Sequence, residues 1–354
     1  MVRRALPWLA LLLVQIAGNT LFGRVSRTWF FPQPLAASPE RTAQLAIAAP
    51  VGSTVQLTLI SADGLSIRRL TNTSGAVSGI AWAPDGRQIA FVDESRGSRQ
   101  IGVIPPSGAA PRALTSGPDD NTSPTWSPDS GRIAFISTRG GRRELYVMNR
   151  DGGGLRQVSH EGGYRTVTWS PEGRYLAAVA ERASADELDL YVMRPDGTQR
   201  LKVNGPPLLP RPGMMLPAWS PDGRRLAYVS RVGRAEQEIT IVSVDGRERR
   251  RLSTGYAPAW SPDGRSIAFV VSRVGDTQIY VSRPDASGSR RLTPGPGIRI
   301  LPAWAPDSSA IAFVDISGGD LVVTIMKPDG SGVRRLLSTT GDLSGLPLFA
   351  WQPR

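Results

Sequence analysis

The sequence predicts an all-β fold: a seven-bladed β-propeller, closed by strands from both ends of the chain and preceded by an N-terminal hydrophobic helix. Three observations predict this fold. A tryptophan-centred motif recurs along the chain, the short strands expected around each copy come in fours, and incomplete repeats at the two ends complement each other. Six blades is the alternative if the N-terminal strands do not pair with the C-terminal one.

The repeat joins a tryptophan to Ser or Ala, a proline, an acidic residue and a short apolar run. Its copies read WAPDGRQIAF, WSPDSGRIAF, WSPEGRYLAA, WSPDGRRLAY, WSPDGRSIAF and WAPDSSAIAF, and they start at Trp82, Trp126, Trp169, Trp219, Trp260 and Trp304. A truncated seventh copy carries Trp351. Successive tryptophans lie 44, 43, 50, 41, 44 and 47 residues apart. Repeats of about 40–50 residues that hold several short strands are typical of propeller blades.

Each repeat predicts four strands. The first ends at the tryptophan, and the Pro-Asp-Gly turn follows because proline fixes φ at about −65° and glycine accepts a positive φ. A second strand such as 88–92 and a third such as 144–148 come next, and a second Asp-Gly turn leads to a fourth strand that ends in Arg-Leu. We expect the tryptophans to pack between neighbouring blades and the turn acids to bond to their own backbone.

The two ends of the chain complete one blade between them. Residues 44–48, 55–60 and 67–70 supply a second, third and fourth strand without a first, whereas residues 346–351 supply a first strand alone. Pairing them removes the open sheet edges that an unclosed ring would expose.

The first residues read as a signal peptide or membrane anchor. Arg3 and Arg4 precede an apolar run from Ala5 to Ala17, a length that suits a signal peptide, and continuation to Gly23 just reaches a membrane span. We therefore predict three segments: residues 1–28 as signal peptide or anchor, 29–41 as a proline-rich linker, and 42–354 as the propeller. The expected location is extracytoplasmic, periplasmic or cell-surface, with the chain either anchored or secreted. A buried first helix of a cytoplasmic domain is the alternative.

Composition limits the chemistry. The chain has no cysteine and one histidine, His160, which argues against thiolate chemistry, a histidine-rich metal centre and most Ser-His-Asp schemes. We expect no cofactor and no metal, although Asp119, Asp120 and Asn121 are a grouping of the kind that holds Ca²⁺. The net charge of +12 comes from arginines that recur within the repeat, so they are spread around the molecule and do not predict nucleic-acid binding. We expect a monomer.

The motif W-[SA]-P-[DE]-G, followed by a strand and Y-V-M-x-x-D-G, resembles the repeat of the TolB-type β-propellers. It is similar as well to the propeller half of prolyl oligopeptidase-like enzymes. The resemblance runs from about Thr42 to Arg354 and implies the fold, but one fold hosts many functions. This chain looks like a lone propeller. Only about forty residues precede the first strand, where TolB carries a further α/β domain, and there is no G-x-S-x-G for a hydrolase domain.

Antiparallel blades place their connections on two faces. The turn face holds the Pro-Asp-Gly turns and the turns between third and fourth strands, which are short and nearly identical. The loop face holds the connections between blades and those between second and third strands, which are long and differ from one another, so we expect binding there. The insertion at 203–217 explains the 50-residue spacing. The candidate binding residues are Asp119, Asp120, Tyr164, Arg165, Arg211, Met214, Met215, Tyr256 and Arg299.

The leading functional hypothesis is an extracytoplasmic, non-catalytic module that recognises a protein or peptide of the cell envelope. The alternative is an enzyme acting on a carbohydrate or lactone at the channel mouth, with its acid and base taken from Asp119, Asp120 and Glu161. A signalling ectodomain with a membrane-crossing N-terminus is a third hypothesis.

Overall fold

A computed structural model describes residues 43–181, 187–205, 208, 216–232, 236–317, 320–340 and 349–353. All regular structure in these residues is β, and they contain no helix long and apolar enough to cross a membrane. The helix expected in residues 1–28 and the linker at 29–41 lie outside the described residues. Every described residue belongs to one compact unit, residues 39–354.

The strands group into antiparallel sets of four, which we name by the tryptophan that ends the first strand. A parallel bridge between Thr277 and Ile298 joins the Trp260 and Trp304 sets into one eight-stranded sheet. The Trp82 unit is β4 (Val77–Trp82), β5 (Ile89–Asp93), β6 (Gln100–Ile104) and β7 (Arg112–Ala113), and the Trp126 unit is β8 (Asn121–Trp126), β9 (Arg132–Ser137), β10 (Glu144–Asn149) and β11 (Arg156–Gln157). The Trp169 unit is β12 (Tyr164–Trp169), β13 (Leu176–Glu181), β14 (Leu188–Met193) and β15 (Leu201–Lys202), and the Trp219 unit is β16 (Ala218–Trp219), β17 (Arg225–Val232), β18 (Glu236–Ser243) and β19 (Arg249–Thr254). The Trp260 unit is β20 (Tyr256–Trp260), β21 (Ile267–Arg273), β22 (Asp276–Ser282) and β23 (Arg290–Arg291), and the Trp304 unit is β24 (Ile298–Trp304), β25 (Ile311–Ser317), β26 (Asp320–Met326) and β27 (Arg334–Thr340).

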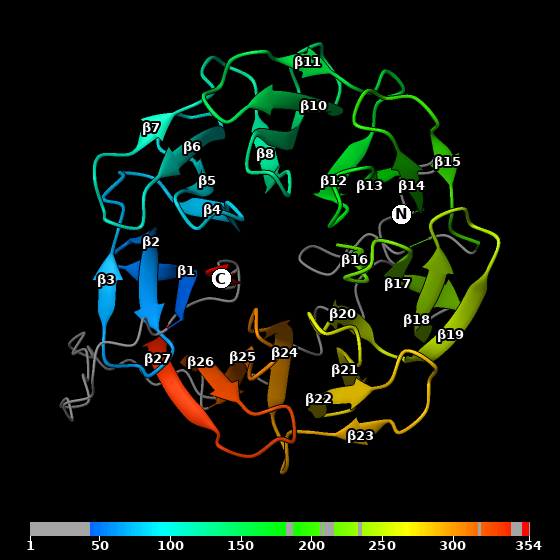
Figure 1. Cartoon of the computed structure of the whole chain (residues 1–354). Coiled ribbons are helices and arrows are strands. Elements are labelled where there is room, and N and C mark those ends of the chain that lie inside the picture. Colours follow the sequence, from blue (N-terminus) through cyan, green and yellow to red (C-terminus); the bar gives the residue numbers. More distant parts are fainter. Residues whose placement is uncertain are drawn as a thin grey trace, which may run out of the picture. The chain divides into compact units, whose positions relative to one another are not determined.

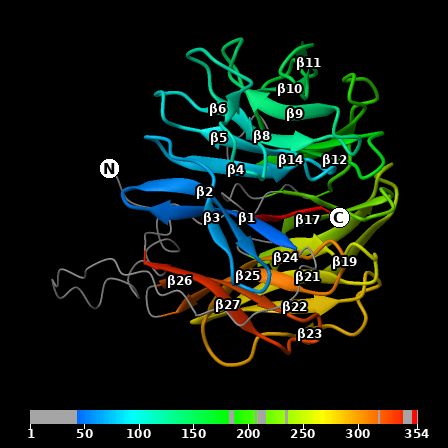
Figure 2. The same ribbon diagram turned by 60° about the vertical axis from the view of Figure 1, so that its left-hand side comes forward.

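The remaining strands come from both ends of the propeller. The Trp351 unit is the sheet β28-β1-β2-β3, made of β28 (Phe349–Trp351), β1 (Gln44–Val51), β2 (Thr54–Ser61) and β3 (Ile67–Arg69). Leu45 pairs with Trp351 and Ile47 with Phe349, as the complementary ends of the sequence predict. Two views place β1–β3 between β4–β7 on one side and β25–β27 on the other (Figure 1, Figure 2). The sheets stand around a common centre, which is a propeller-like arrangement (Figure 1).

The predicted Pro-Asp-Gly turns are held by their acidic side chains. In the Trp126 unit, Asp129 Oδ1 accepts hydrogen bonds from the Ser127 hydroxyl at 2.5 Å and the Gly131 N–H at 2.9 Å. The Ser127 hydroxyl and the Gly131 N–H lower the pKa of Asp129, because both favour the charged carboxylate. The left-handed position, which is Gly86 in the Trp82 unit, is here Ser130 with φ 57°. Its hydroxyl accepts the Asp85 N–H of the preceding unit at 2.9 Å, so this departure from glycine links two units.

The repeat tryptophans lie between units, as predicted, and all seven are buried. Four of them also donate the indole N–H to a first-strand carbonyl of the preceding unit, at 3.0–3.1 Å: Trp82 to Ala350, Trp126 to Ala81, Trp304 to Ala259 and Trp351 to Ala303. The indole nitrogens of Trp169, Trp219 and Trp260 have no partner among the described residues.

A second contact between units, the arginine clasp, joins an arginine near the start of the fourth strand to the next unit. Its guanidinium donates to backbone carbonyls of the turn between the third and fourth strands; Arg290, for example, donates to Pro328 and Asp329 at 2.9 and 3.0 Å. The same clasp is made by Arg68, Arg112, Arg156, Arg250 and Arg334. In the Trp169 unit the corresponding position is Leu201, which pairs with Val192 as Arg156 pairs with Val147. The repeated Arg of the sequence is therefore chiefly a joint between units.

Candidate functional site

The described residues that the sequence predicted for binding lie at or next to strand ends on the loop face. Asp120 Oδ1 accepts the Arg99 N–H at 2.9 Å, and its Oδ2 lies 3.1 Å from the Arg99 guanidinium. The Asp119 carbonyl accepts hydrogen bonds from the side-chain amides of Gln100 and Asn121. The segment is thus tied down by neighbouring side chains. No group of His, Cys, Asp or Glu suited to a metal ion occurs in the described part of the chain.

Tyr164 is a core residue rather than an exposed loop residue. It is the first residue of β12 and has no accessible surface. Burial raises the pKa of Tyr164 to about 12, because the phenolate would lose its hydration. Its hydroxyl accepts the Arg200 Nε–H at 3.0 Å, and the Arg200 guanidinium lies 3.6 Å from the ring centre of Tyr191.

Arg165 and Arg299 lie on the loop face but are engaged in ion pairs. Arg165 Nη2 lies 2.5 Å from Glu181, which Arg143 contacts at the same distance. Arg299 Nε lies 3.3 Å from Asp315, and both side chains are largely buried.

Tyr256, like Tyr164, is buried at the start of a strand and packs in a cluster with Ile300 and Val314. The structure therefore places Tyr256 close to the Arg299 segment, and the described residues that the sequence predicted for binding take part in separate contacts. Arg211, Met214 and Met215 lie outside the described residues, so their predicted role in binding is not examined by the structure.

A repeated polar latch, which sequence reasoning missed, fixes the loops between units. A Gln, Glu or Asp near the start of the third strand bonds to a Thr, Ser or Asn fifteen residues later. The later residue also accepts the backbone N–H that follows the first, as Thr115 does for Ile101 at 2.8 Å. The pairs are Gln56–Thr71, Gln100–Thr115, Glu144–Ser159, Asp189–Asn204 and Gln278–Thr293. The constant spacing of fifteen is a signal that could have revealed them.

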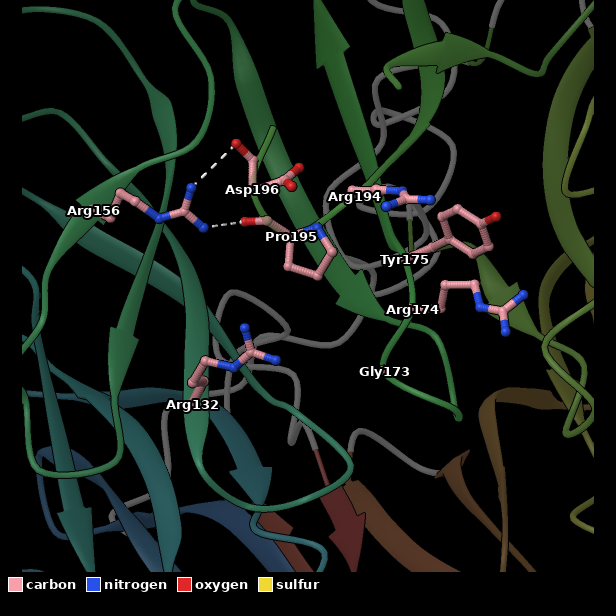
Figure 3. Close-up of a pocket in the computed structure, with 8 residues that line it drawn as sticks. All are labelled: Arg132, Arg156, Gly173, Arg174, Tyr175, Arg194, Pro195 and Asp196. Carbon is pink, nitrogen blue, oxygen red and sulfur yellow. Dashed lines mark hydrogen bonds between the residues drawn. The ribbon is translucent and has the colours of Figure 1, made fainter. Parts of the chain in front are cut away.

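A cavity of about 520 Å³ lies on the turn face, whereas the sequence predicted binding on the loop face. It is lined by residues of two neighbouring units: Arg132, Arg156, Gly173, Arg174, Tyr175, Arg194, Pro195 and Asp196 (Figure 3). Arg132 begins β9 and Arg156 begins β11 in the Trp126 unit. The other residues come from the two turns of the Trp169 unit, so the repeat brings both turn types to one place.

Two of the four arginines are fixed by contacts to the Trp169 unit. Arg156 clasps the Pro195 and Asp196 carbonyls at 2.7 and 3.1 Å, as Figure 3 shows. The Arg132 guanidinium lies over the Trp169 ring, 5.0 Å from its centre. Both contacts leave guanidinium N–H donors for a further partner, because each guanidinium carries five.

The single carboxylate of the cavity, Asp196, is ill suited to donate a proton. The hydroxyl and the backbone N–H of Thr198 bond to Asp196 Oδ1 at 2.6 and 2.9 Å and lower the pKa of this carboxyl. Asp196 is therefore ionised near neutral pH. The cavity has four guanidinium groups and one carboxylate, an arrangement that attracts anions and lacks the paired carboxyls of acid–base hydrolysis.

Comparison with known proteins agrees with this architecture. The sequence matches the TolB β-propeller domain over residues 38–203 and 184–348. Among curated protein sequences, none matches significantly. Three similar solved structures illustrate the range of the fold.

A putative TolB from Agrobacterium tumefaciens is 23% identical, covers 69% of this chain and 93% of its own, and has a TM-score of 0.53. TolB from Acinetobacter baumannii is 19% identical, with coverages of 85% and 79% and a TM-score of 0.57. An oligogalacturonate lyase from Vibrio parahaemolyticus is 13% identical, with coverages of 77% and 83% and a TM-score of 0.62. At these identities the likeness concerns the fold alone. The match to the domain spans most of the chain and confirms the resemblance seen in the repeats: the chain belongs to the TolB β-propeller domain family.

Proposed function

We propose that this chain is a seven-bladed propeller, closed by β28 on β1, that acts outside the cytoplasmic membrane by binding and not by catalysis. Its partner is a protein or peptide of the cell envelope, bound on the loop face. Family membership and the pairing of β1 with β28 support the architecture. The charged and apolar N-terminal segment of the sequence supports the location.

The observation that carries the proposal is the pairing of six described loop-face carboxylates with cations. Asp120, Glu181 and Asp315 are paired as described above. Further pairs join Asp189 to Lys202 at 2.9 Å, Glu238 to Arg251 at 3.0 Å and Asp276 to Arg291 at 3.5 Å. Each of these carboxylates is already engaged by a cation of the protein itself. A fixed pattern of alternating charge is instead suited to selecting a partner and its orientation.

The test is site-specific photo-crosslinking in cells that produce the full chain. A photoreactive amino acid replaces Val274, which is 93% exposed in the loop-face connection between β21 and β22. The matched control replaces Val333, an exposed valine on the turn face just before β27. We expect one discrete protein adduct from position 274 and none from position 333. The purified partner should then bind the full chain with a measurable Kd.

Two outcomes would contradict the proposal. Equal adducts from both positions would indicate non-specific capture. Turnover of a small-molecule substrate that disappears when Asp120 or Glu181 is replaced by its amide would favour the enzyme alternative.

A further inference from the structure

We propose that the turn-face cavity between the Trp126 and Trp169 units binds a compact polyanion whose charges are phosphate or carboxylate groups. The inference is independent of the loop-face function, because the two sites lie at opposite ends of the strands.

The charge of the cavity is the first support. Four arginines line it against one carboxylate, and that carboxylate is already bonded to Thr198. Within the described ranges, Arg132, Arg174 and Arg194 form no ion pair. Arg194 donates its Nε–H to Gln199 at 2.9 Å, and the Arg132 guanidinium lies over the Trp169 ring, 5.0 Å from its centre. Guanidinium N–H groups that lack an anion match the oxygen pairs of phosphate and carboxylate.

Rigidity is the second support. The Arg156 clasp fixes the Pro195–Asp196 turn, and the stacking on Trp169 fixes Arg132. Half of the guanidinium groups are therefore positioned before any ligand arrives, which lowers the entropy lost on binding. The volume of about 520 Å³ lies within the range of small-molecule pockets, which is roughly 300–1,000 Å³.

The distribution of arginine among the repeats is the third support. The position of Arg132 is Gln88 in the Trp82 unit and Ser266 in the Trp260 unit, and the position of Arg174 is Gly131 in the Trp126 unit. One other junction carries arginine at all four positions: Arg225, Arg250, Arg265 and Arg283. There Arg225 lies 5.2 Å from the ring centre of Trp260, and Ser266 replaces Tyr175. The full arginine set is thus a feature of particular junctions and not of the repeat itself.

Isothermal titration calorimetry on the full chain tests the proposal, with pyrophosphate as the phosphate probe and citrate as the carboxylate probe. The test variant is Arg174→Gln with Arg194→Gln, which removes two exposed guanidinium groups and leaves the clasp and the stacked arginine in place. The matched control is Arg87→Gln with Lys327→Gln. These exposed cations occupy the same two turn positions in other units, so the control removes the same net charge.

We expect at least one probe to bind, the test variant to weaken its affinity by about ten-fold or more, and the control to change it less than two-fold. The identity of the tighter probe distinguishes phosphate from carboxylate. Thermal unfolding of both variants checks that each is folded.

Equal weakening in both variants, or no binding of either probe at millimolar concentration, would overturn the proposal. Flotation with phosphatidylglycerol vesicles supplies a further arm. Vesicle binding that pyrophosphate and citrate do not compete away would assign the charge to a diffuse membrane-facing surface and would also overturn it.

Discussion

Two junctions of the ring are held together by different means. Between the Trp260 and Trp304 units, Arg290 clasps the Pro328 and Asp329 carbonyls, and the indole of Trp304 donates to Ala259 at 3.0 Å. Between the Trp169 and Trp219 units, Leu201 occupies the clasp position and Trp219 Nε1 has no partner within the described residues.

The second junction lacks the clasp and the indole hydrogen bond, although Arg249 Nε–H of the Trp219 unit donates to the Val203 carbonyl of the Trp169 unit at 3.1 Å, and it keeps its apolar contacts. Trp219 is buried and packs in one cluster with Val179, Leu190 and Leu226. Its first strand β16 has two residues, whereas β24 has seven. The second junction therefore relies more on apolar burial than the first, where two kinds of directional contact to backbone carbonyls add strength and fix the geometry.

The largest expected effect is the removal of a tryptophan at the complete junction. Trp304→Ala should lower the free energy of unfolding by about 3–5 kcal/mol, because it leaves a cavity between two units. The measurement is the urea midpoint of the full chain, with Trp219→Ala for comparison. If Trp219→Ala proved the more costly of the two, the incomplete junction would not be the weaker one.

Replacing tryptophan with phenylalanine isolates the contribution of the indole hydrogen bond to the free energy of unfolding. Trp304→Phe removes the indole donor to the Ala259 carbonyl, so it should cost about 1 kcal/mol more than Trp219→Phe. Trp219→Phe removes a buried N–H that has no described partner, and only a packing change remains. Equal losses in the two variants would show that the 3.0 Å contact of Trp304 adds nothing to stability.

The repeat made the units predictable, because Trp, Pro-Asp-Gly and the Arg-Leu ending each fix a local backbone shape. Strands β1, β2 and β3 begin and end within three residues of their expected bounds, and their pairing partner at the C-terminus was foreseen. The burial of Tyr164 and Tyr256, two candidate binding residues, was not predicted. The register of β12 shifts between Tyr164 and Thr166, and that of β20 between Tyr256 and Ala259. A shift of this kind changes the face on which a side chain lies, so alternation along the sequence does not predict burial there.

The turn-face cavity was not predicted, because its residues are separated along the chain. Arg132 belongs to one repeat and Arg174 to the next, and each taken alone looks like an exposed turn arginine. Only the packing of neighbouring units brings them together. The informative signal is a comparison of neighbouring repeats, in which one repeat supplies Arg132 and Arg156 and the next supplies arginine at two other positions, Arg174 and Arg194.

A substitution can introduce an arginine clasp at Leu201, the one clasp position without arginine. Leu201→Arg should raise the free energy of unfolding by about 0.5–1 kcal/mol, if its guanidinium reaches the turn carbonyls of the Trp219 unit as Arg156 reaches those of the Trp169 unit. Leu155→Arg is the matched control. Leu155 is 44% exposed and Leu201 42%, and Leu155 does not occupy a clasp position. Chemical denaturation of both variants measures the gain, and an equal gain in both would mean that replacing an exposed leucine is sufficient.

The smallest expected effect is that of the Asp129 turn carboxylate on stability, and its dependence on pH distinguishes it from the contribution of an arginine clasp. The pKa of Asp129 is lowered in the folded state, so its carboxylate contributes stability that is present above the ordinary value of 3.8 and is lost as pH falls through the folded pKa. Because the group is exposed, Asp129→Asn should cost about 0.5 kcal/mol or less at pH 7. The loss should vanish below the folded pKa, where the native side chain is neutral too.

An arginine bonded to backbone carbonyls does not titrate in this range, so the gain from Leu201→Arg should be the same at pH 7 and pH 3. A pH-dependent gain would indicate that the new guanidinium pairs with a carboxylate, such as Asp245 in the neighbouring turn, and not with the backbone.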